Sequence, residues 1–261
     1  MTFQSLLGKN YKWWYVLTFY YKSNNSSRLN SIGYLVSAIL SSAVLILVWS
    51  TSKQILLNEI FTYILIGRLF FVNLHFSNDL LQDISNGRIT TYMLYPTKLL
   101  SFYLIRDLGW NSFIQIVNIV LTVGIMILLN NLLIFGSLVN LGIFILFLPL
   151  TYLLELSTEI LFGSIAFYLP WGWGILSLSS DVSKVLSGSR FPLSLFSFTL
   201  PLLVLFPAFG YHHPMQIYLG KYSQLEILQT FAGGIIWCLV LFILARIVFK
   251  MGLKRNEAVG L

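Results

Sequence analysis

The hydrophobic positions of this chain gather in long runs, and most charged positions lie in the gaps between them. A run of about 20 mostly apolar residues can cross a bilayer as a helix. Six transmembrane helices are therefore predicted, at residues 31–50, 56–76, 103–129, 132–154, 156–178 and 228–249. The expected fold class is an all-α integral membrane protein, in which residues 1–261 form a single transmembrane domain.

Composition supports this prediction. The chain is 57% hydrophobic and only 10% charged, with a mean hydropathy of +0.81. Soluble domains carry about 25% charged residues, so these few charges cannot cover a water-facing surface. The net charge is +7, but Lys and Arg lie near the ends of the apolar runs, which suits lipid headgroups and topology better than nucleic acid. The single cysteine, Cys238, excludes an intramolecular disulfide.

The distribution of Lys and Arg predicts the orientation. With six spans, the side that holds both termini carries ten basic residues, and the other side carries three or four. Basic residues are enriched in cytoplasmic loops. Both termini are therefore expected in the cytoplasm, and the ten residues on that side are Lys9, Lys12, Lys22, Arg28, Arg88, Lys98, Arg106, Lys250, Lys254 and Arg255.

Two segments match neither a plain loop nor a plain span. Residues 1–30 mix lysines with many Trp, Tyr and Phe residues, which predicts an amphipathic helix along the inner membrane interface. The alternative is a frayed aromatic tail. Residues 187–222 are apolar but rich in proline, which predicts an outer re-entrant hairpin of two short helices. Its marker residues are Gly188, Pro192, Pro201, Pro207, Pro214 and Gly220. The alternative there is a seventh complete span, which would move the C-terminus outside.

Ionisable residues inside the predicted spans are candidates for function, because a charge in lipid is costly. They are Arg68, Glu155, Glu159 and Arg246. The two glutamates flank the predicted turn between the fourth and fifth spans, and they share one face if a single helix carries both. The alternative role of these residues is an interhelical ion pair or a headgroup contact.

Signs of enzymatic chemistry are sparse. The chain has no phosphate-binding loop motif and no Cys/His cluster for a metal, and the adjacent His212 and His213 point apart. The nearest candidate is the series His75, Asp79 and Asp83, whose spacing of four places them on one helical face. A membrane-embedded enzyme that modifies lipid stays an alternative on this basis.

A polar segment, residues 77–102, separates the second and third spans and includes the stretch DISNGRITTYMLYP. This stretch resembles a segment of ABC-2-type permeases of about this length, with an Ile-x-x-Gly-x-Ile core followed by a leucine and a proline. The matching residues here are Ile84, Gly87, Ile89, Leu94 and Pro96. A second similarity follows the fifth span, at Ser187, Gly188, Phe191, Pro192, Leu193, Pro207, Pro214, Leu219 and Gly220. The chain departs from that pattern at SLFSF, where the family often has another proline.

The resemblance implies a permease subunit that exports its substrate across the cytoplasmic membrane of a bacterium. It implies cytosolic ABC ATPase subunits as partners, which bind ATP and Mg, and a second permease that is identical or paralogous. No cofactor is expected in this chain. Residues 77–102 would be the coupling helix, with Asp79, Asp83 and Arg88 as charged docking residues. A secondary transporter or channel without an ATPase, and a loop that only sets topology, stay as alternatives.

Overall fold

The protein is described by a computed structural model that covers residues 11–25, 28–51, 56–70, 74–95, 97–134, 136–169, 172–190, 192–193 and 204–259. No strand occurs among these residues, which confirms the predicted all-α class. The helices in the first half are α2 (Tyr11–Asn25), α3 (Arg28–Ser50), α4 (Leu57–Phe70), α5 (Phe76–Ser85), α6 (Arg88–Met93) and α7 (Leu99–Leu128). Those in the second half are η2 (Asn130–Leu132), α8 (Leu138–Gly163), η3 (Ser164–Phe167), α9 (Trp173–Leu186), α11 (Phe206–Gly210), α12 (His212–Tyr218) and α13 (Gln224–Val259).

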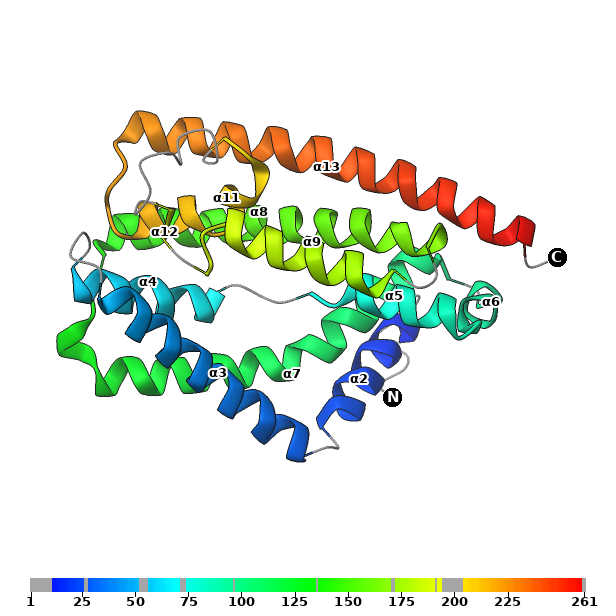
Figure 1. The fold of residues 1–261 in the computed structure, drawn as a ribbon, viewed down its shortest axis with the longest axis horizontal. Coiled ribbons are helices and arrows are strands. Elements are labelled where there is room, and N and C mark those ends of the chain that lie inside the picture. The colour runs from blue at the N-terminus through cyan, green and yellow to red at the C-terminus, as the bar shows by residue number, and fades with distance from the viewer. Residues whose placement is uncertain are drawn as a thin grey trace, which may run out of the picture.

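The long helices lie lengthwise and the short helices gather at the two ends (Figure 1). Helix α13 packs along α8, and α2 and α4 both contact α7. One end of the molecule carries α5 and α6, which belong to the predicted coupling helix, and the C-terminal end of α13; we call it the coupling end after that prediction. The opposite end carries η2, α12 and the start of α4. The two short-helix regions that the sequence singled out therefore lie at opposite ends of the bundle.

Each end has its own apolar core. The core of the coupling end joins α5, α7, α8 and α13 through buried residues that include Phe76, Leu80, Tyr103, Ile160 and Phe249. The core of the opposite end joins α4, α8 and α12, with buried residues that include Ile60, Tyr63, Phe144 and Met215. Burial of large apolar side chains in these cores, and in a third core that includes Phe147 and Leu154 of α8 and Leu241 of α13, holds the helices together.

The predicted boundary between the fourth and fifth spans is wrong. Helix α8 continues without a break through residues 154–156, so Glu155 and Glu159 lie within one helix and not at a turn. Leucine and glutamate are good helix formers, and nothing between Leu154 and Leu156 stops the helix. The break comes at Gly163, where the chain tightens into η3 before α9 begins at Trp173. Pro149 lies inside α8 and does not end it.

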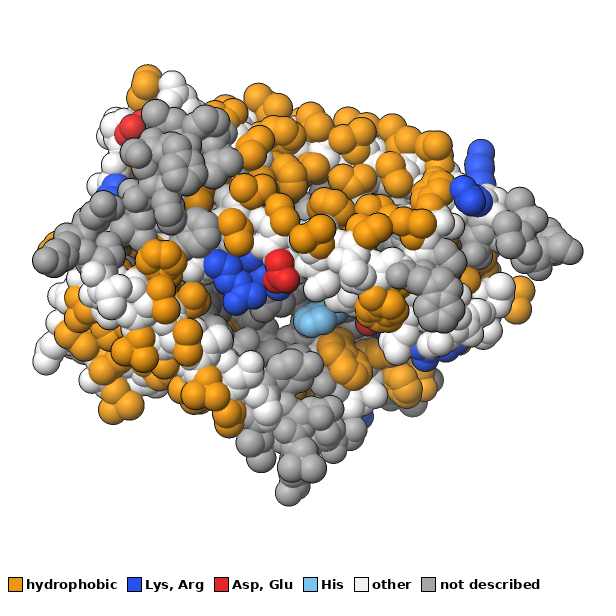
Figure 2. All heavy atoms as spheres, in the orientation of Figure 1, with side chains coloured by type: hydrophobic (Ala, Val, Ile, Leu, Met, Phe, Trp, Pro, Cys, Tyr) orange, Lys and Arg blue, Asp and Glu red, His pale blue; other side chains and the backbone are white. Residues whose placement is uncertain are grey.

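The surface of the described residues suits a lipid environment. Helices α7 and α13, and α8 together with η3, are long and apolar enough to cross a membrane. Shorter apolar stretches occur at Ile39–Ser50 and Leu57–Gly67. Hydrophobic side chains cover much of the face shown in Figure 2, including the part above the central hollow. These observations show a multi-pass membrane protein.

Helix α2 packs on α7. A Cβ added at Gly109 of α7 would lie 2.6 Å from the backbone oxygen of Leu17, so the two helices are in close backbone contact. Trp14, Tyr15 and Phe19 on the outer face of α2 are exposed. An aromatic outer face is typical of the membrane–water interface. The interfacial location of residues 1–30 stays a prediction, and residues 1–10 lie outside the described part.

Candidate functional site

The polar segment of residues 77–102 folds into two short helices joined by a tight turn. Helix α5 ends at Ser85, and α6 begins at Arg88. Gly87 between them has φ = +70°, a left-handed backbone conformation that favours glycine. Its N–H donates to the carbonyl of Ile84 at 3.0 Å. The coupling segment, as we name α5 and α6 with their turn, therefore has a bend that the sequence specifies through Gly87. Pro96 lies outside the described residues.

Arg106 of α7 fixes this segment with a cluster of charges. Its guanidinium pairs with Asp83 at 2.5 Å and with Asp79 at 3.1 Å. Asp83 also pairs with Arg88 at 3.0 Å and accepts a hydrogen bond from the Tyr103 hydroxyl at 3.0 Å. Burial raises the pKa of Asp79, and the positive charge of Arg106 opposes that shift. The cluster places two carboxylates of α5 against α7.

The predicted docking residues therefore divide into two groups. Asp83 is fully buried and Ile89 is 2% exposed, so these two hold the segment together and do not form its surface. Asp79 and Ile84 are partly buried. Gly87, Arg88 and Leu94 are exposed, and the side chain of Leu94 is 85% exposed. In the series His75, Asp79 and Asp83, both aspartates pair with Arg106, and a catalytic role of the series stays a prediction.

The N-terminal end of α5 is attached to α8 and α7 by two carboxylates. Glu159 of α8 accepts a hydrogen bond from the backbone N–H of Ser77 at 3.0 Å. Asp107 of α7 accepts one from the backbone N–H of His75 at 2.9 Å. Free N–H groups at a helix start favour such acceptors. Movement of the coupling segment would therefore act directly on α8.

Between the two cores lies a cleft of about 1120 Å³. Figure 2 shows a hollow on this face, with basic, acidic and histidine side chains around it. Four helices each contribute a row of polar side chains, spaced three or four residues apart so that each row occupies one helical face. The rows are Ser37 and Ser41 of α3, Asn111, Gln115 and Asn118 of α7, Thr151, Glu155 and Thr158 of α8, and Ser177, Ser180 and Lys184 of α9. Glu159 beside Thr158, and Ser187 directly after α9, also line the cleft.

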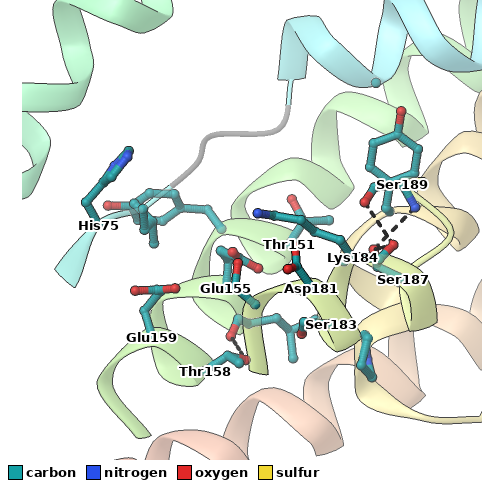
Figure 3. Close-up of a pocket in the computed structure, with 18 of the residues that line it drawn as sticks. His75, Thr151, Glu155, Thr158, Glu159, Asp181, Ser183, Lys184, Ser187 and Ser189 are labelled. Carbon is teal, nitrogen blue, oxygen red and sulfur yellow. Dashed lines mark hydrogen bonds between the residues drawn. The ribbon is translucent and has the colours of Figure 1, made fainter. Parts of the chain in front are cut away.

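Figure 3 shows the charged groups of this polar cleft. Glu155 and Glu159 project from α8 near His75, and Lys184 extends from α9 toward Glu155. Asp181 of α9 pairs with Arg190 at 3.7 Å. The Nδ1 atom of His75 is buried and has no hydrogen-bond partner among the described residues. Among these residues, no group of His, Cys, Asp and Glu could hold a metal ion.

Of the other two charged candidates, the structure places one, Arg246, away from the cleft. Arg246 is exposed on α13 and does not line the cleft. Arg68 belongs to α4, but its side chain lies outside the described part. Of the three candidates whose side chains are described, the structure brings together Glu155 and Glu159.

The structure describes part of the predicted outer hairpin, residues 187–222. Gly188 and Gly220 have left-handed backbones, with φ of +83° and +70°, at its two ends. Pro192, Pro207 and Pro214 are buried, and Pro201 lies outside the described residues. The N–H of His212 donates to the carbonyl of Ser187 at 3.0 Å, which joins the start of α12 to the end of α9. The predicted depth of the hairpin in the outer leaflet stays a prediction.

His212 gives a testable pH dependence. Burial, with the charges of His213 and Lys221, lowers the pKa of His212 to about 3, whereas an unfolded histidine has a pKa of about 6.5. Between these values only the unfolded chain binds this proton, so the stability of the folded state falls as the pH decreases from about 6.5 toward 3. We expect a His212→Gln variant to lose less stability than the wild type over that range, by at most about 1.4 kcal/mol per pH unit. Thermal melts in detergent at pH 7, 6, 5 and 4 measure the difference, and equal slopes for the two proteins would contradict the prediction.

Sequence reasoning missed the polar row on α7. Asn111, Gln115 and Asn118 stand at positions i, i+4 and i+7 of an otherwise apolar helix, which is a signal that periodicity could have found. Uncharged amides at this spacing are a weaker signal than the charged residues of the predicted spans, because an amide costs less to bury than a charge. Polar side chains on a membrane helix face the bundle interior or a wet cavity, and together these rows predict a cleft.

The comparisons with known proteins agree with this architecture. The sequence profile of the family described as "ABC-2 family transporter protein" matches residues 34–260. The comparison with curated proteins gives no significant match. The profile match spans the helices of the bundle from α3 to α13, including the coupling segment and the cleft. The chain is therefore a membrane protein of the ABC-2 transporter family.

Proposed function

We propose that this chain is the permease subunit of an ATP-driven exporter and that the coupling segment docks a separate cytosolic ATPase. The observation that supports this best is Leu94, a leucine that is 85% exposed beside the half-exposed Tyr95 at the coupling end. Leu94 and Tyr95 together form an exposed apolar pair directly after α6, and a partner that covered this pair would remove apolar surface from water. Arg88, also exposed, adds a charge beside it.

The contacts of the coupling segment supply a route for movement. ATP binding, with Mg, would bring two partner ATPases together and push α5 and α6. The carboxylate of Glu159 holds the start of α5, so the push would reach α8. Glu155, one turn earlier on α8, lines the polar cleft. The proposed cycle thus links the docking surface to the cleft through a single helix.

The proposal includes a second permease, identical or paralogous, that forms the pathway together with this chain. In the proposed arrangement the protein lies in the cytoplasmic membrane of a bacterium, with both termini on the cytoplasmic side. The opposite chain orientation would place Leu94 outside the cell, where no ATPase could reach it.

Co-purification tests the docking. The full-length protein is extracted from native membranes in mild detergent, and its partners are identified by mass spectrometry. We expect a soluble ABC ATPase with the wild type and at least a tenfold lower yield of it with Leu94→Asp, because a desolvated charge would replace an apolar contact. Leu138→Asp is the matched control, since Leu138 is 87% exposed at the start of α8.

Two outcomes would count against the proposal. Recovery of no ATPase with the folded wild type would favour a secondary transporter or channel. Equal loss of ATPase with Leu94→Asp and Leu138→Asp would show that the coupling segment is not the docking surface. The number of permease copies in the same sample, measured by native mass spectrometry, tests the dimer.

A further inference from the structure

The polar cleft is built to form many hydrogen bonds. The rows on α7 and α9 consist of amides and hydroxyls, which in contact with lipid would lack partners. On α9 the lining includes Ser177, Ser180 and Lys184, spaced three and four residues apart, together with Ser179, Asp181 and Ser183. Some of these polar groups already donate within the chain, as Asn111 does to Asp107, but their acceptor atoms would lack partners against a fully apolar cargo. Apolar side chains such as Leu148 and Leu154 line the same cleft, so the lining suits a molecule with both apolar faces and hydroxyl or amide groups.

The charged side chains of the cleft favour a positively charged ligand. Glu159 is engaged by the backbone N–H of Ser77, and Asp181 is paired with Arg190. Glu155 has no ion pair or hydrogen bond within the part of the chain that the structure describes, and its side chain is exposed to the cleft. Its interaction with Lys184 is a longer-range attraction. A carboxylate in this position is available to an ammonium group, and the low-dielectric surroundings strengthen that contact.

The size and the remaining lining narrow the class of ligand. Pockets for drug-sized ligands measure about 300–1,000 Å³, and this cleft of about 1120 Å³ exceeds them. Its wall also includes the aromatic rings of Trp173, Phe206 and Tyr211, and Trp173 is 46% exposed. Flat apolar rings beside hydroxyl groups suit the mixed faces of sugar rings, which carry C–H groups and hydroxyls together.

We propose that the cleft binds a polyhydroxylated organic cation of the amino-sugar class, with its ammonium group at Glu155 and its hydroxyls along α9. This inference rests on the proposed function, because it names the class of cargo that the permease would carry. Lys184 would repel the same ammonium group and so tune the affinity.

Three probe molecules show whether binding depends on the positive charge of the ligand or on its hydroxyl groups. The first is the fully deacetylated glucosamine trisaccharide, which carries three amines, and the second is its N-acetylated form, which has the same sugar backbone without charge. The third is spermidine, which is cationic but has no hydroxyls. Binding is measured by isothermal titration to the full-length protein in nanodiscs. We expect the deacetylated trisaccharide to bind at least tenfold more tightly than either of the other two.

Two variants test the roles of Glu155 and Lys184, and they are expected to change the binding affinity in opposite directions. Glu155→Gln should weaken binding of the deacetylated trisaccharide at least tenfold and leave the acetylated form unchanged. Lys184→Gln should tighten binding of the deacetylated form several-fold, because it removes a repelling charge. Both variants keep side-chain size and hydrogen bonding, and unchanged melting temperatures would show that both remain folded.

The binding results distinguish the proposed ligand class from its alternatives. Equal affinity for the two trisaccharides, equal affinity for spermidine, or no binding of any probe would overturn the inference. A Glu155→Gln variant that weakens both trisaccharides alike would also overturn it. If the ATPase co-purifies while no probe binds, the proposed function stands and the inference fails. If the deacetylated trisaccharide binds through Glu155 and no ATPase is recovered, the cleft belongs to a different kind of transporter.

Discussion

Replacement of Arg106 by methionine is expected to destabilise the coupling end by about 3–5 kcal/mol, the cost of breaking a buried ion pair from one side. Without Arg106, the fully buried Asp83 would keep only Arg88 as an ion-pair partner among the described residues, and Asp79 would lose its ion-pair partner. The same guanidinium lies 5.4 Å from the ring of Tyr20 in α2. One substitution would therefore loosen α5 and α2 from α7 together.

The melting temperature in detergent and hydrogen exchange of the coupling segment measure this effect. Arg88→Met is the matched control, because Arg88 also pairs with Asp83 but its side chain is 47% exposed, so about 1 kcal/mol or less is expected. Arg106→Lys should give an intermediate result, since an ammonium group cannot present the planar fork that reaches two carboxylates at once. A melting temperature of Arg106→Met equal to that of Arg88→Met would show that the cluster does not carry the stability of this end.

Replacement of Gly163 by valine is expected to push α5 away from α8. A Cβ at Gly163 would lie 2.8 Å from Cα of Ser77 and 3.2 Å from the ring of Phe76, so the backbone of α5 has to move. Overpacking of this kind costs about 1–3 kcal/mol. The shift would also lengthen the hydrogen bond from Ser77 to Glu159, which is the proposed link between the docking surface and α8.

Gly142 gives a control in the same helix. An added Cβ there meets no atom within 4 Å in the described structure, so Gly142→Val should leave the fold unchanged. Hydrogen exchange over residues 74–85 is the measurement, with faster exchange expected for Gly163→Val alone. If ATPase co-purification persists in that variant while ATP no longer alters binding in the cleft, the transmission route gains direct support. Unchanged protection of α5 would mean that the helices adjust without separating.

At the coupling end, the sequence alone does not predict which charged residues are buried in ion pairs. Asp83 and Arg88 stand in a polar segment, and a polar segment predicts exposure. Arg88 is exposed as this pattern predicts, whereas Asp83 is buried, because Arg106, which lies 23 positions after Asp83 along the chain, pairs with it where α7 packs against α5. For Leu94 the sequence predicts neither burial nor exposure, since an isolated leucine can be found in both environments. It is exposed because no neighbouring helix packs over it in the described structure.

Some features followed from the sequence by itself. Long apolar runs determined membrane helices, because hydrocarbon accepts only backbones whose polar groups are bonded internally. Gly87 determined the bend between α5 and α6, because a left-handed backbone excludes most side chains. The family followed from short motifs in the polar segment and the proline-rich segment, and the profile match confirms it.

Only the tertiary structure decided which polar residues act together. The rows on α3, α7, α8 and α9 are each weak signals, and they form one cleft because the apolar faces pack into cores at both ends of the bundle. The need for glycine at position 163 is also decided by tertiary structure, because a larger side chain there would meet Ser77 of α5. Local propensity fixes where a helix can form, whereas the contacts between distant segments decide where it stops and what its polar face meets.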